Sequence, residues 1–352
     1  MRWLVFALAL AGVAGQGAAS ALPRSLAARA PRVDVPGSIR VGILKPGGGY
    51  TVTTLPMETY VARVLAGEAM RDSDPAALQA LAITIRTFAL TNRTRHRADG
   101  FDLCDQTHCQ VLRAAVAATE RAAQATAGRV LLHAGVPASI YYSASCGGRT
   151  QRPSDVWPGA EDPSYLPSRD DDACEGAPAW VAELHERDLR RALQASGFRG
   201  ELRDLRIAAR NDGGRVARLK LDGLTPDEIS GQDFRVAVGR TLGWQHIKST
   251  AFDLRKKDGW YQFSGHGSGH GVGLCVVGSA RLAARGASAE AILARYFPGL
   301  DISSNQDLPR VTPSPSAATR GTPGPASGSP RGASRPPAAR PAPAPTPTPS
   351  DI

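Results

Sequence analysis

Glu68 is the carboxylate whose sequence context best suits acid–base chemistry. In the segment METYVARVLAGEAM it follows Val64 by four residues and Leu65 by three, so a continuous helix places it on the apolar face. Burial disfavours the ionised form of a carboxyl group and raises its pKa. A carboxylic acid that stays protonated near neutral pH can donate a proton to a glycosidic oxygen. The alternative is a surface glutamate at a frayed helix end.

The segment CDQTHC places Cys104, His108 and Cys109 close together, with His96 shortly before them. Cysteine and histidine at such spacing can hold zinc, which is the cofactor that this group would bind. In an oxidising compartment a Cys104–Cys109 disulfide is the simpler interpretation. We therefore expect the disulfide, with a zinc site formed by all four residues as the alternative.

The chain has five cysteines, and an odd number leaves at least one thiol outside any set of disulfides. Cys146 lies just before the loop-rich stretch 147–180, and Cys174 lies within it. We expect these two residues to form a second disulfide, which leaves Cys275 as the single thiol.

Glycines alternate with His266 and His270 in the segment SGHGSGHGVGLC. Glycine allows tight or left-handed turns and close approach of the backbone to a ligand. The segment lacks the spacing of a phosphate loop and of the HExxH zinc motif. We expect both histidines to contact a ligand.

Arg86 lies inside the apolar segment LAITIRTFAL. A buried arginine requires an anionic partner. That partner could be Glu68, another carboxylate or a substrate oxygen, and a structural ion pair is the favoured interpretation.

The hydrophobic patterns predict a mixed α+β fold, with early and late helices around β-strands in a single large domain. Apolar residues recur at helical spacing over 56–70 and 75–92, the segments that carry Glu68 and Arg86. The loop with two histidines precedes a final helix. We expect strands over 38–54, 129–135, 138–145, 202–222 and 247–263, and further helices over 113–127 and 287–296.

Both ends of the sequence differ in composition from residues 38–300, where we expect the folded domain. Residues 1–21 combine a positive start, a short apolar run and an Ala-Ser-Ala site, as expected of a cleaved signal peptide. The apolar run is shorter than the roughly 20 residues that span a bilayer, so we expect no membrane anchor after cleavage. Residues 308–352 are basic and rich in proline and alanine, which is typical of a disordered tail.

The net charge of +10 suits an anionic partner such as the cell wall. No basic motif interleaved with aromatic residues supports nucleic-acid binding. The sequence therefore predicts an exported protein of the periplasm, the cell wall or the extracellular space, with no nucleic-acid partner.

Six segments of the sequence match the motifs of a known family. They are METYVARVLAGEAM, ALQALAITIRTFAL, DLCDQTHCQVL, ATAGRVLLHAGVPASIYYSASCGGRT, DVWPGAEDPSYL and GHGVGLCVVGSARLAARGASAEAILARYFPG. In this order they resemble the SpoIID/LytB family, named for stage II sporulation protein D and the amidase-enhancer proteins. The resemblance covers residues 38–300. The chain departs from the family at Leu81, Leu112, Tyr142 and Val276, where glutamine, tyrosine, histidine and glutamine are usual.

The resemblance implies a peptidoglycan lytic transglycosylase, which cuts the strand between N-acetylmuramic acid and N-acetylglucosamine and forms 1,6-anhydro-N-acetylmuramic acid. The family's essential acid falls on Glu68, which would act as the single acid and base without a cofactor. Glu58→Gln, earlier in the same helix, is expected to leave the release of anhydro products nearly unchanged. We expect the glycan to contact Arg86, Ser145, Gly147, Gly148, His266, His270 and Gly271.

The partner implied by the resemblance is the peptidoglycan glycan strand, together with an N-acetylmuramoyl-L-alanine amidase. Two alternatives stay open. One is a non-catalytic peptidoglycan-binding amidase enhancer. The other is a zinc-dependent cell-wall hydrolase centred on His96, Cys104, His108 and Cys109.

Export predicts that the mature chain begins near Leu22, after the Ala-Ser-Ala site. N-terminal sequencing of protein recovered from outside the cytoplasm checks this. Recovered protein that still begins at Met1 would contradict cleavage.

Overall fold

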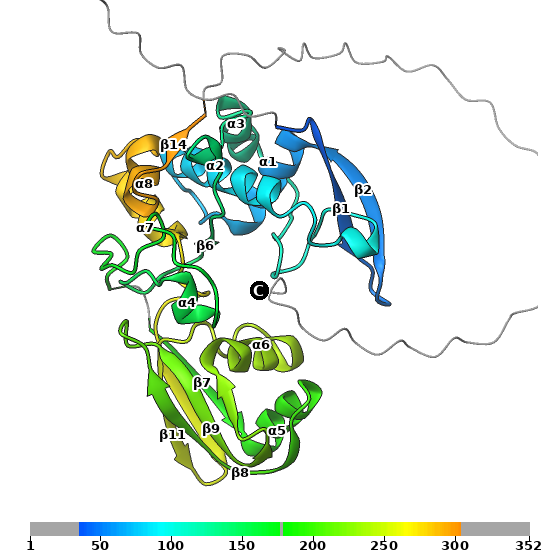
Figure 1. Ribbon diagram of the computed structural model, residues 1–352, viewed down its shortest axis with the longest axis vertical. Coiled ribbons are helices and arrows are strands. Elements are labelled where there is room, and N and C mark those ends of the chain that lie inside the picture. The colour runs from blue at the N-terminus through cyan, green and yellow to red at the C-terminus, as the bar shows by residue number, and fades with distance from the viewer. Residues whose placement is uncertain (1–34, 177–178, 304–352) are drawn as a thin grey trace, which may run out of the picture.

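The described part of the chain begins with a β-hairpin and two helices (Figure 1). Glu68 is the last residue of the first helix. The computed structural model describes residues 35–176 and 179–303, so the expected signal peptide 1–21 and tail 308–352 lie outside the described residues. Within those described ranges, no helix combines the length and the apolar composition needed to cross a bilayer.

The hairpin forms where the sequence alternates between polar and apolar residues. Strand β1 (Ser38–Leu44) pairs antiparallel with β2 (Tyr50–Pro56), and a glycine-rich turn joins them. β1 also pairs in parallel with the short strand β3 (Leu103–Cys104). This pairing brings the first cysteine of the CDQTHC segment beside the hairpin.

Helices α1 (Met57–Glu68) and α2 (Pro75–Thr91) form the core of this first part. α2 is buried along most of its length because α1, α3 (Ala117–Ala125), α7 (Val276–Ala284) and α8 (Ala289–Tyr296) pack against it. α1 buries one face at the three- and four-residue spacing expected from the sequence. That face consists of Met57, Tyr60, Val61, Val64 and Leu65.

Short strands and turns complete the first part. One three-stranded sheet has the order β14-β4-β5, and a parallel pair joins β13 to β6. Helix α4 is a single turn that follows this region. The bounds are β4 Leu131–His133, β5 Val136–Pro137, β6 Tyr142–Ser143, β13 Leu274–Cys275, β14 Asp301–Ile302, α4 Pro153–Val156 and a 3-10 turn at Arg97–Asp99.

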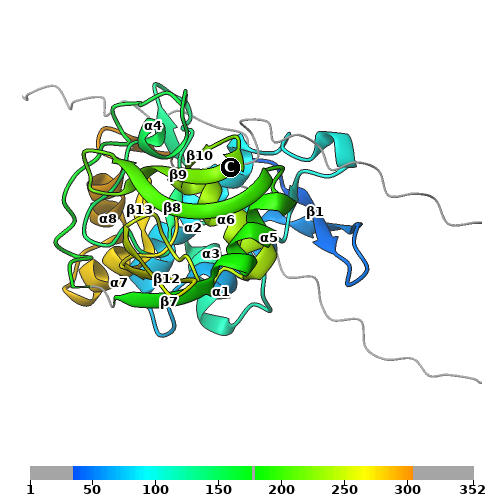
Figure 2. The ribbon, with the colours of Figure 1, turned by 90° about the horizontal axis from the view of Figure 1, so that it is seen from below.

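The second part of the fold has its own hydrophobic core. It consists of two antiparallel three-stranded sheets and the helices α5 and α6 (Figure 2). The strand orders are β10-β9-β8 and β11-β12-β7. The bounds are β7 Trp180–His185, α5 Glu186–Ala195, β8 Arg199–Arg210, β9 Val216–Thr225, β10 Glu228–Ser230, α6 Gly231–Leu242, β11 Phe252–Lys257 and β12 Trp260–Gly265.

The glycine- and histidine-rich loop joins the two parts. Ser268 exchanges backbone hydrogen bonds with Ser145, the N–H of Gly269 donates to the carbonyl of Lys248, and the N–H of Gln151 donates to the carbonyl of Gly271. The loop is therefore held from both sides.

The α+β class and the early and late helices are confirmed, and the helices α1, α2 and α8 lie where the apolar spacing predicts them. α5, α6, α7 and strand β7 were not predicted from the sequence. The helix expected over 113–127 begins only at Ala117, because the backbone N–H of Arg113 donates to the carbonyl of Arg63 on α1 (3.0 Å). The chain before α3 thus runs alongside α1 instead of coiling.

Arg86 forms a structural ion pair, which is the interpretation that the sequence favours, and its full burial contradicts the expected contact with the glycan. Its side chain is fully buried and forms a bidentate ion pair with Glu58, with Nε 3.1 Å from Oε1. It also donates to the carbonyl of Arg129 (2.9 Å). Glu58, which is not expected to take part in catalysis, is therefore the counter-charge that allows an arginine inside the core.

Glu58→Ala should destabilise the protein by about 3 kcal/mol, because it leaves the buried guanidinium of Arg86 without its carboxylate. Urea unfolding measures the loss. Glu120→Ala is the matched control, since Glu120 is exposed on the first turn of α3 and should cost less than about 0.5 kcal/mol. Equal stability of the two variants would contradict the role given to this ion pair.

Candidate functional site

Glu68 lines a cleft of about 620 Å³ between the two parts of the fold. One wall comes from the end of α1, the segment 106–111 and the residues around β6. The other wall comes from α6 and the loop 268–270. The cleft therefore joins Glu68 to residues nearly two hundred positions later in the chain, including Arg240, Trp244 and His270.

The position of Glu68 depends on its neighbour Gly67. A Cβ atom at Gly67 would lie 2.2 Å from the carbonyl oxygen of Val111, so only glycine allows this close approach. The approach lets the backbone N–H of Val111 donate to Oε1 of Glu68 at 2.9 Å. Oε1 is thus fixed as an acceptor, and Oε2 is the oxygen available to carry a proton.

Burial raises the pKa of Glu68 above its ordinary value of 4.5. The hydrogen bond from Val111 and the charge of Arg113 favour the carboxylate and oppose this shift, but the desolvation effect is larger. The sequence-based expectation of a raised pKa is confirmed in direction. A raised pKa extends the pH range over which the carboxyl group is protonated and can act as a general acid.

A buried hydrogen-bonded chain supports the segment that holds Val111. The hydroxyl of Tyr60 on α1 donates to Oε1 of Gln110 (2.6 Å), and Nε2 of Gln110 donates to the hydroxyl of Tyr142 (3.1 Å). Gln110 is fully buried. The chain connects α1, the 106–111 segment and β6, which all line the cleft.

The cleft carries aromatic rings and polar atoms that have no partner within the described residues. Unpaired buried atoms on its walls are Oγ of Ser143, Nε1 of Trp157 and Oε1 of Gln232. Because a buried polar atom without a partner is costly, these atoms suit a ligand that brings its own hydrogen-bonding groups. The aromatic side chains on the walls are Tyr50, Phe88, Tyr141, Tyr142, Trp157 and Trp244.

His270 is the histidine of the glycine-rich loop that reaches the cleft. Burial, together with the nearby charges of Arg235 and Arg215, lowers its pKa to about 3, so the ring is neutral at physiological pH. Its Nδ1 accepts from the N–H of Val272 (3.0 Å), which places the proton on Nε2. The ring packs against Trp157, with 5.1 Å between centroids.

The other predicted glycan contacts do not line this cleft. His266 is exposed outside it, and a Cβ at Gly147 would lie 2.8 Å from the ring of His266. Ser145 is buried, with Oγ 3.2 Å from Sγ of Cys174. Gly147, Gly148 and Gly271 have φ angles of +72°, +97° and +82°, so they shape the loops that support the walls.

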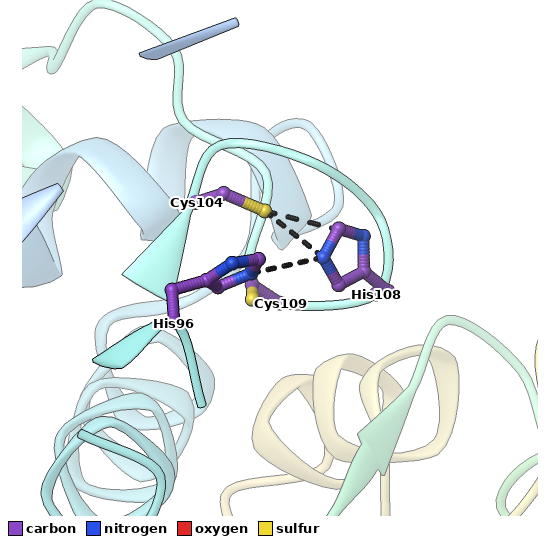
Figure 3. A group of neighbouring side chains, drawn as sticks. All are labelled: His96, Cys104, His108 and Cys109. Carbon is purple, nitrogen blue, oxygen red and sulfur yellow. Dashed lines mark hydrogen bonds between the residues drawn. The ribbon is translucent and has the colours of Figure 1, made fainter. Parts of the chain in front are cut away.

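His96, Cys104, His108 and Cys109 form a cluster beside the cleft, here named the Cys–His cluster (Figure 3). All five cysteines are free thiols in the structure, so neither the Cys104–Cys109 nor the Cys146–Cys174 disulfide is formed. Cys104 instead faces a histidine: its Sγ lies 3.2 Å from Nε2 of His108. Nε2 of His108 in turn lies 3.1 Å from Nε2 of His96.

The donor atoms of the Cys–His cluster fit a tetrahedral zinc ion. Each residue offers one atom, and all four atoms lie within 4.8 Å of one another. Zn–N and Zn–S bonds of about 2.0 and 2.3 Å put neighbouring ligands about 3.3–3.8 Å apart. Nδ1 of His96 lies 2.7 Å from Oδ2 of Asp99, which is the carboxylate contact that commonly orients a ligating histidine.

Helix α6 contributes residues that the sequence did not single out. Its cleft-facing side carries Gln232, Arg235 and Arg240. Arg235 also lies over the ring of Trp244, 5.2 Å from its centroid. The spacing of Phe234, Ala237 and Val238 is the sequence signal that could have revealed this helix.

Comparisons with known proteins agree with the two-part cleft. The stage II sporulation protein (SpoIID) family matches residues 47–133, which include Glu68 and the Cys–His cluster. A domain of unknown function (DUF8618) matches residues 178–273, which include α6 and His270. Both walls of the cleft therefore contain residues from these matched regions.

Similar proteins include an uncharacterized protein of Brachyspira hyodysenteriae, 29% identical over 257 residues, or 71% of this chain and 67% of that protein. Stage II sporulation protein D of Bacillus amyloliquefaciens is 25% identical over 278 residues, covering 72% and 76% of the two chains. The amidase enhancer of Bacillus subtilis is 24% identical over 282 residues, 65% of this chain but 38% of that protein.

Glu68→Gln should make the protein more stable at neutral pH. Because the folded-state pKa is raised, the native protein binds this proton more tightly than the unfolded chain does, and ionisation costs stability. The stability advantage of the variant should therefore grow as pH rises from 4.5 and level off above the raised pKa. Its size should be about 1.4 kcal/mol for each pH unit that separates the folded-state pKa from the unfolded one. Urea unfolding from acidic to neutral pH tests this. A difference independent of pH would contradict the burial of an ionisable Glu68.

Proposed function

We propose that this chain, which belongs to the SpoIID/LytB family, is an exported peptidoglycan lytic transglycosylase whose single acid and base is Glu68. The observation that carries the proposal is a carboxyl group with a raised pKa on the wall of a cleft lined by aromatic and unpaired polar groups. Such a lining suits a sugar polymer, which offers apolar ring faces together with hydroxyl and amide groups.

In the first step, protonated Glu68 donates its proton to the oxygen that links N-acetylmuramic acid to N-acetylglucosamine. The bond from C1 of the muramic sugar to that oxygen breaks, and the ring passes through an oxocarbenium-like state. The leaving N-acetylglucosamine keeps the donated proton as a hydroxyl. Glu68 is left as a carboxylate that accepts the Val111 N–H.

In the second step, the carboxylate of Glu68 removes the proton from the C6 hydroxyl of the same muramic sugar. The C6 oxygen bonds to C1 and closes the 1,6-anhydro ring, which restores protonated Glu68. Neutral His270, with its proton on Nε2, can donate a hydrogen bond but no proton, because its pKa is lowered to about 3. We assign it to positioning the glycan.

The guanidinium groups on α6 suit an anionic glycan. Arg235 and Arg240 line the wall formed by the second part of the fold. Each N-acetylmuramic acid unit without a stem peptide carries a lactyl carboxylate. We therefore assign these arginines to the acidic groups of the strand, which places the polymer between the two walls.

We assign a structural role to the Cys–His cluster. Four protein ligands complete a tetrahedral zinc site, whereas catalytic zinc sites keep one position open for water. A zinc ion bound there would neutralise the thiolates and hold the chain from Cys104 to Cys109. This chain leads directly to Val111, so the cluster would position the N–H donor of Glu68. A zinc-dependent hydrolase is the less favoured function for the same reason.

An amidase enhancer that binds peptidoglycan without cutting it is the second candidate, because one similar protein carries that name. The two functions differ in their products. A transglycosylase releases anhydro-sugar ends from glycan strands, whereas an enhancer leaves the strands intact.

Glu68→Gln should lower the release of 1,6-anhydro products from peptide-free peptidoglycan by at least ~10²–10⁴-fold, the usual worth of one acid–base group. The substitution keeps the shape of the side chain and its acceptor for Val111. Mass spectrometry of digested glycan strands measures the products, and a pull-down with insoluble peptidoglycan measures binding.

Glu120→Gln, at an exposed position on α3, is the matched control and should retain wild-type activity. Anhydro products formed by Glu68→Gln at the wild-type rate would overturn the catalytic assignment. Binding without products from the wild-type protein would favour the enhancer. Cell-wall cleavage that stops in a zinc chelator, while Glu68→Gln stays fully active, would favour the zinc hydrolase.

A further inference from the structure

Four buried side chains converge at a second place, outside the cleft lining: Cys146, Asp171, Cys174 and Cys275, here named the Cys–Asp cluster. Each offers one sulfur or carboxylate oxygen, and these atoms lie within 4.8 Å of one another. Each of the four residues is at most 2% exposed. The proposed reaction uses none of them.

The Cys–Asp cluster draws together three segments that are distant in sequence. Cys146 follows strand β6, and Asp171 and Cys174 belong to the long connection between α4 and β7. Cys275 ends strand β13 and caps helix α7. β6 and β13 pair with each other, and the cluster brings the 171–174 segment, which lies outside the named helices and strands, to that pair.

The contacts in the Cys–Asp cluster suit metal-bound sulfur. Sγ of Cys275 accepts backbone N–H groups from Cys146 (3.2 Å) and Gly278 (3.3 Å), the latter at the start of α7. Backbone N–H donors and a helix N-terminus both favour a thiolate. Sγ of Cys146 lies 3.2 Å from Oδ2 of Asp171.

Asp171 is held in place from its outer side, as a ligating carboxylate usually is. The hydroxyl of Tyr296 donates to Oδ2 (2.8 Å), and Arg295 donates to Oδ1 (3.2 Å). Gly278 makes room for this arrangement, since a Cβ there would lie 2.0 Å from the Tyr296 hydroxyl and 2.8 Å from Oδ2 of Asp171.

The buried side chain of Arg215 independently indicates that the Cys–Asp cluster carries negative charge. Its side chain is buried and donates to the carbonyl oxygens of Cys146 (2.7 Å) and Gly269 (3.4 Å). Among the described residues, no carboxylate forms an ion pair with it. A buried cation requires a nearby anion, and a cluster of thiolates around a metal ion provides one.

We propose that the Cys–Asp cluster binds one structural zinc ion. Three sulfurs and one oxygen match the ligand types and the tetrahedral number that zinc prefers, and binding releases the three thiol protons to solvent. A disulfide uses only two sulfurs, so it would not explain why a third thiol and a carboxylate lie at the same place. This correction replaces our expectation of a Cys146–Cys174 bridge, and it does not depend on the proposed reaction.

The zinc ion would stabilise one wall of the cleft. Ser143 and Ala144, shortly before Cys146, line the cleft, and Ser145 pairs with Ser268 in the loop that carries His270. Joining Cys146 to Cys275 therefore fixes the two segments on which this wall is built.

Native mass spectrometry of the full chain, purified without reductant and challenged with a zinc chelator, tests the proposal. Cys275→Ser should hold one zinc ion fewer than the wild type. Asp171→Asn should lose that ion at a chelator concentration at least about 10-fold lower. Asp172→Asn is the matched control: Asp172 also pairs with Arg295, but it is exposed and outside the cluster, so its zinc count should equal that of the wild type.

A non-reducing peptide map of the wild type keeps the test independent of how well the variants fold. It should find Cys146, Cys174 and Cys275 as thiols. A disulfide between any two of them would overturn the proposal. So would a wild type without zinc, or a zinc count that Cys275→Ser and Asp171→Asn both leave unchanged. Because the Cys–His cluster keeps its ligands in all these variants, the difference in count reports on the Cys–Asp cluster alone.

Discussion

The contact between the end of α1 and the backbone of Val111 is the constraint on which the site depends. Gly67 allows the end of α1 and the segment at Val111 to touch, and this contact both covers part of Glu68 and gives its Oε1 a backbone donor. Burial raises the pKa while the hydrogen bond opposes the rise, and burial has the larger effect. The carboxyl group is therefore oriented without being held permanently as an anion, which is the condition for donating and recovering a proton.

Much of the first part of the fold serves to hold this contact. The Arg86–Glu58 pair lies at the start of α1, and the chain from Tyr60 through Gln110 to Tyr142 lies further along it. A zinc ion bound by the Cys–His cluster would anchor the segment immediately before Val111. The second part adds the opposite wall through α6 and the loop of His270. The cleft therefore has one wall from each of the two parts of the fold.

Local spacing was enough to place α1, α2 and Glu68, because a buried helical face repeats every three to four residues. It was not enough for Arg86, whose partner Glu58 is 28 residues away, or for the cysteines, whose partners depend on how loops meet. Both expected disulfides joined neighbours in the sequence or across a loop. The structure instead groups sulfur with histidine in one cluster and with aspartate in the other.

The glycine-rich loop also could not be placed from local sequence alone. Its composition correctly indicated an irregular backbone, but only the packed structure distinguishes His270, which reaches the cleft, from His266, which does not. The polar wall of α6 was missed for a related reason. Its helical spacing is short, and Arg235 and Arg240 reach the cleft only because distant parts of the chain come together there.

The titration of Glu68 itself is the most direct test of this arrangement. Carbon NMR of protein labelled at the glutamate carboxyl carbons, with Glu68→Gln used to assign the signal, measures its pKa in the folded state. We predict a pKa above the ordinary 4.5, coinciding with the pH at which release of anhydro products declines on the alkaline side. A Glu68 signal that titrates at or below 4.5 would contradict the central role given to its burial.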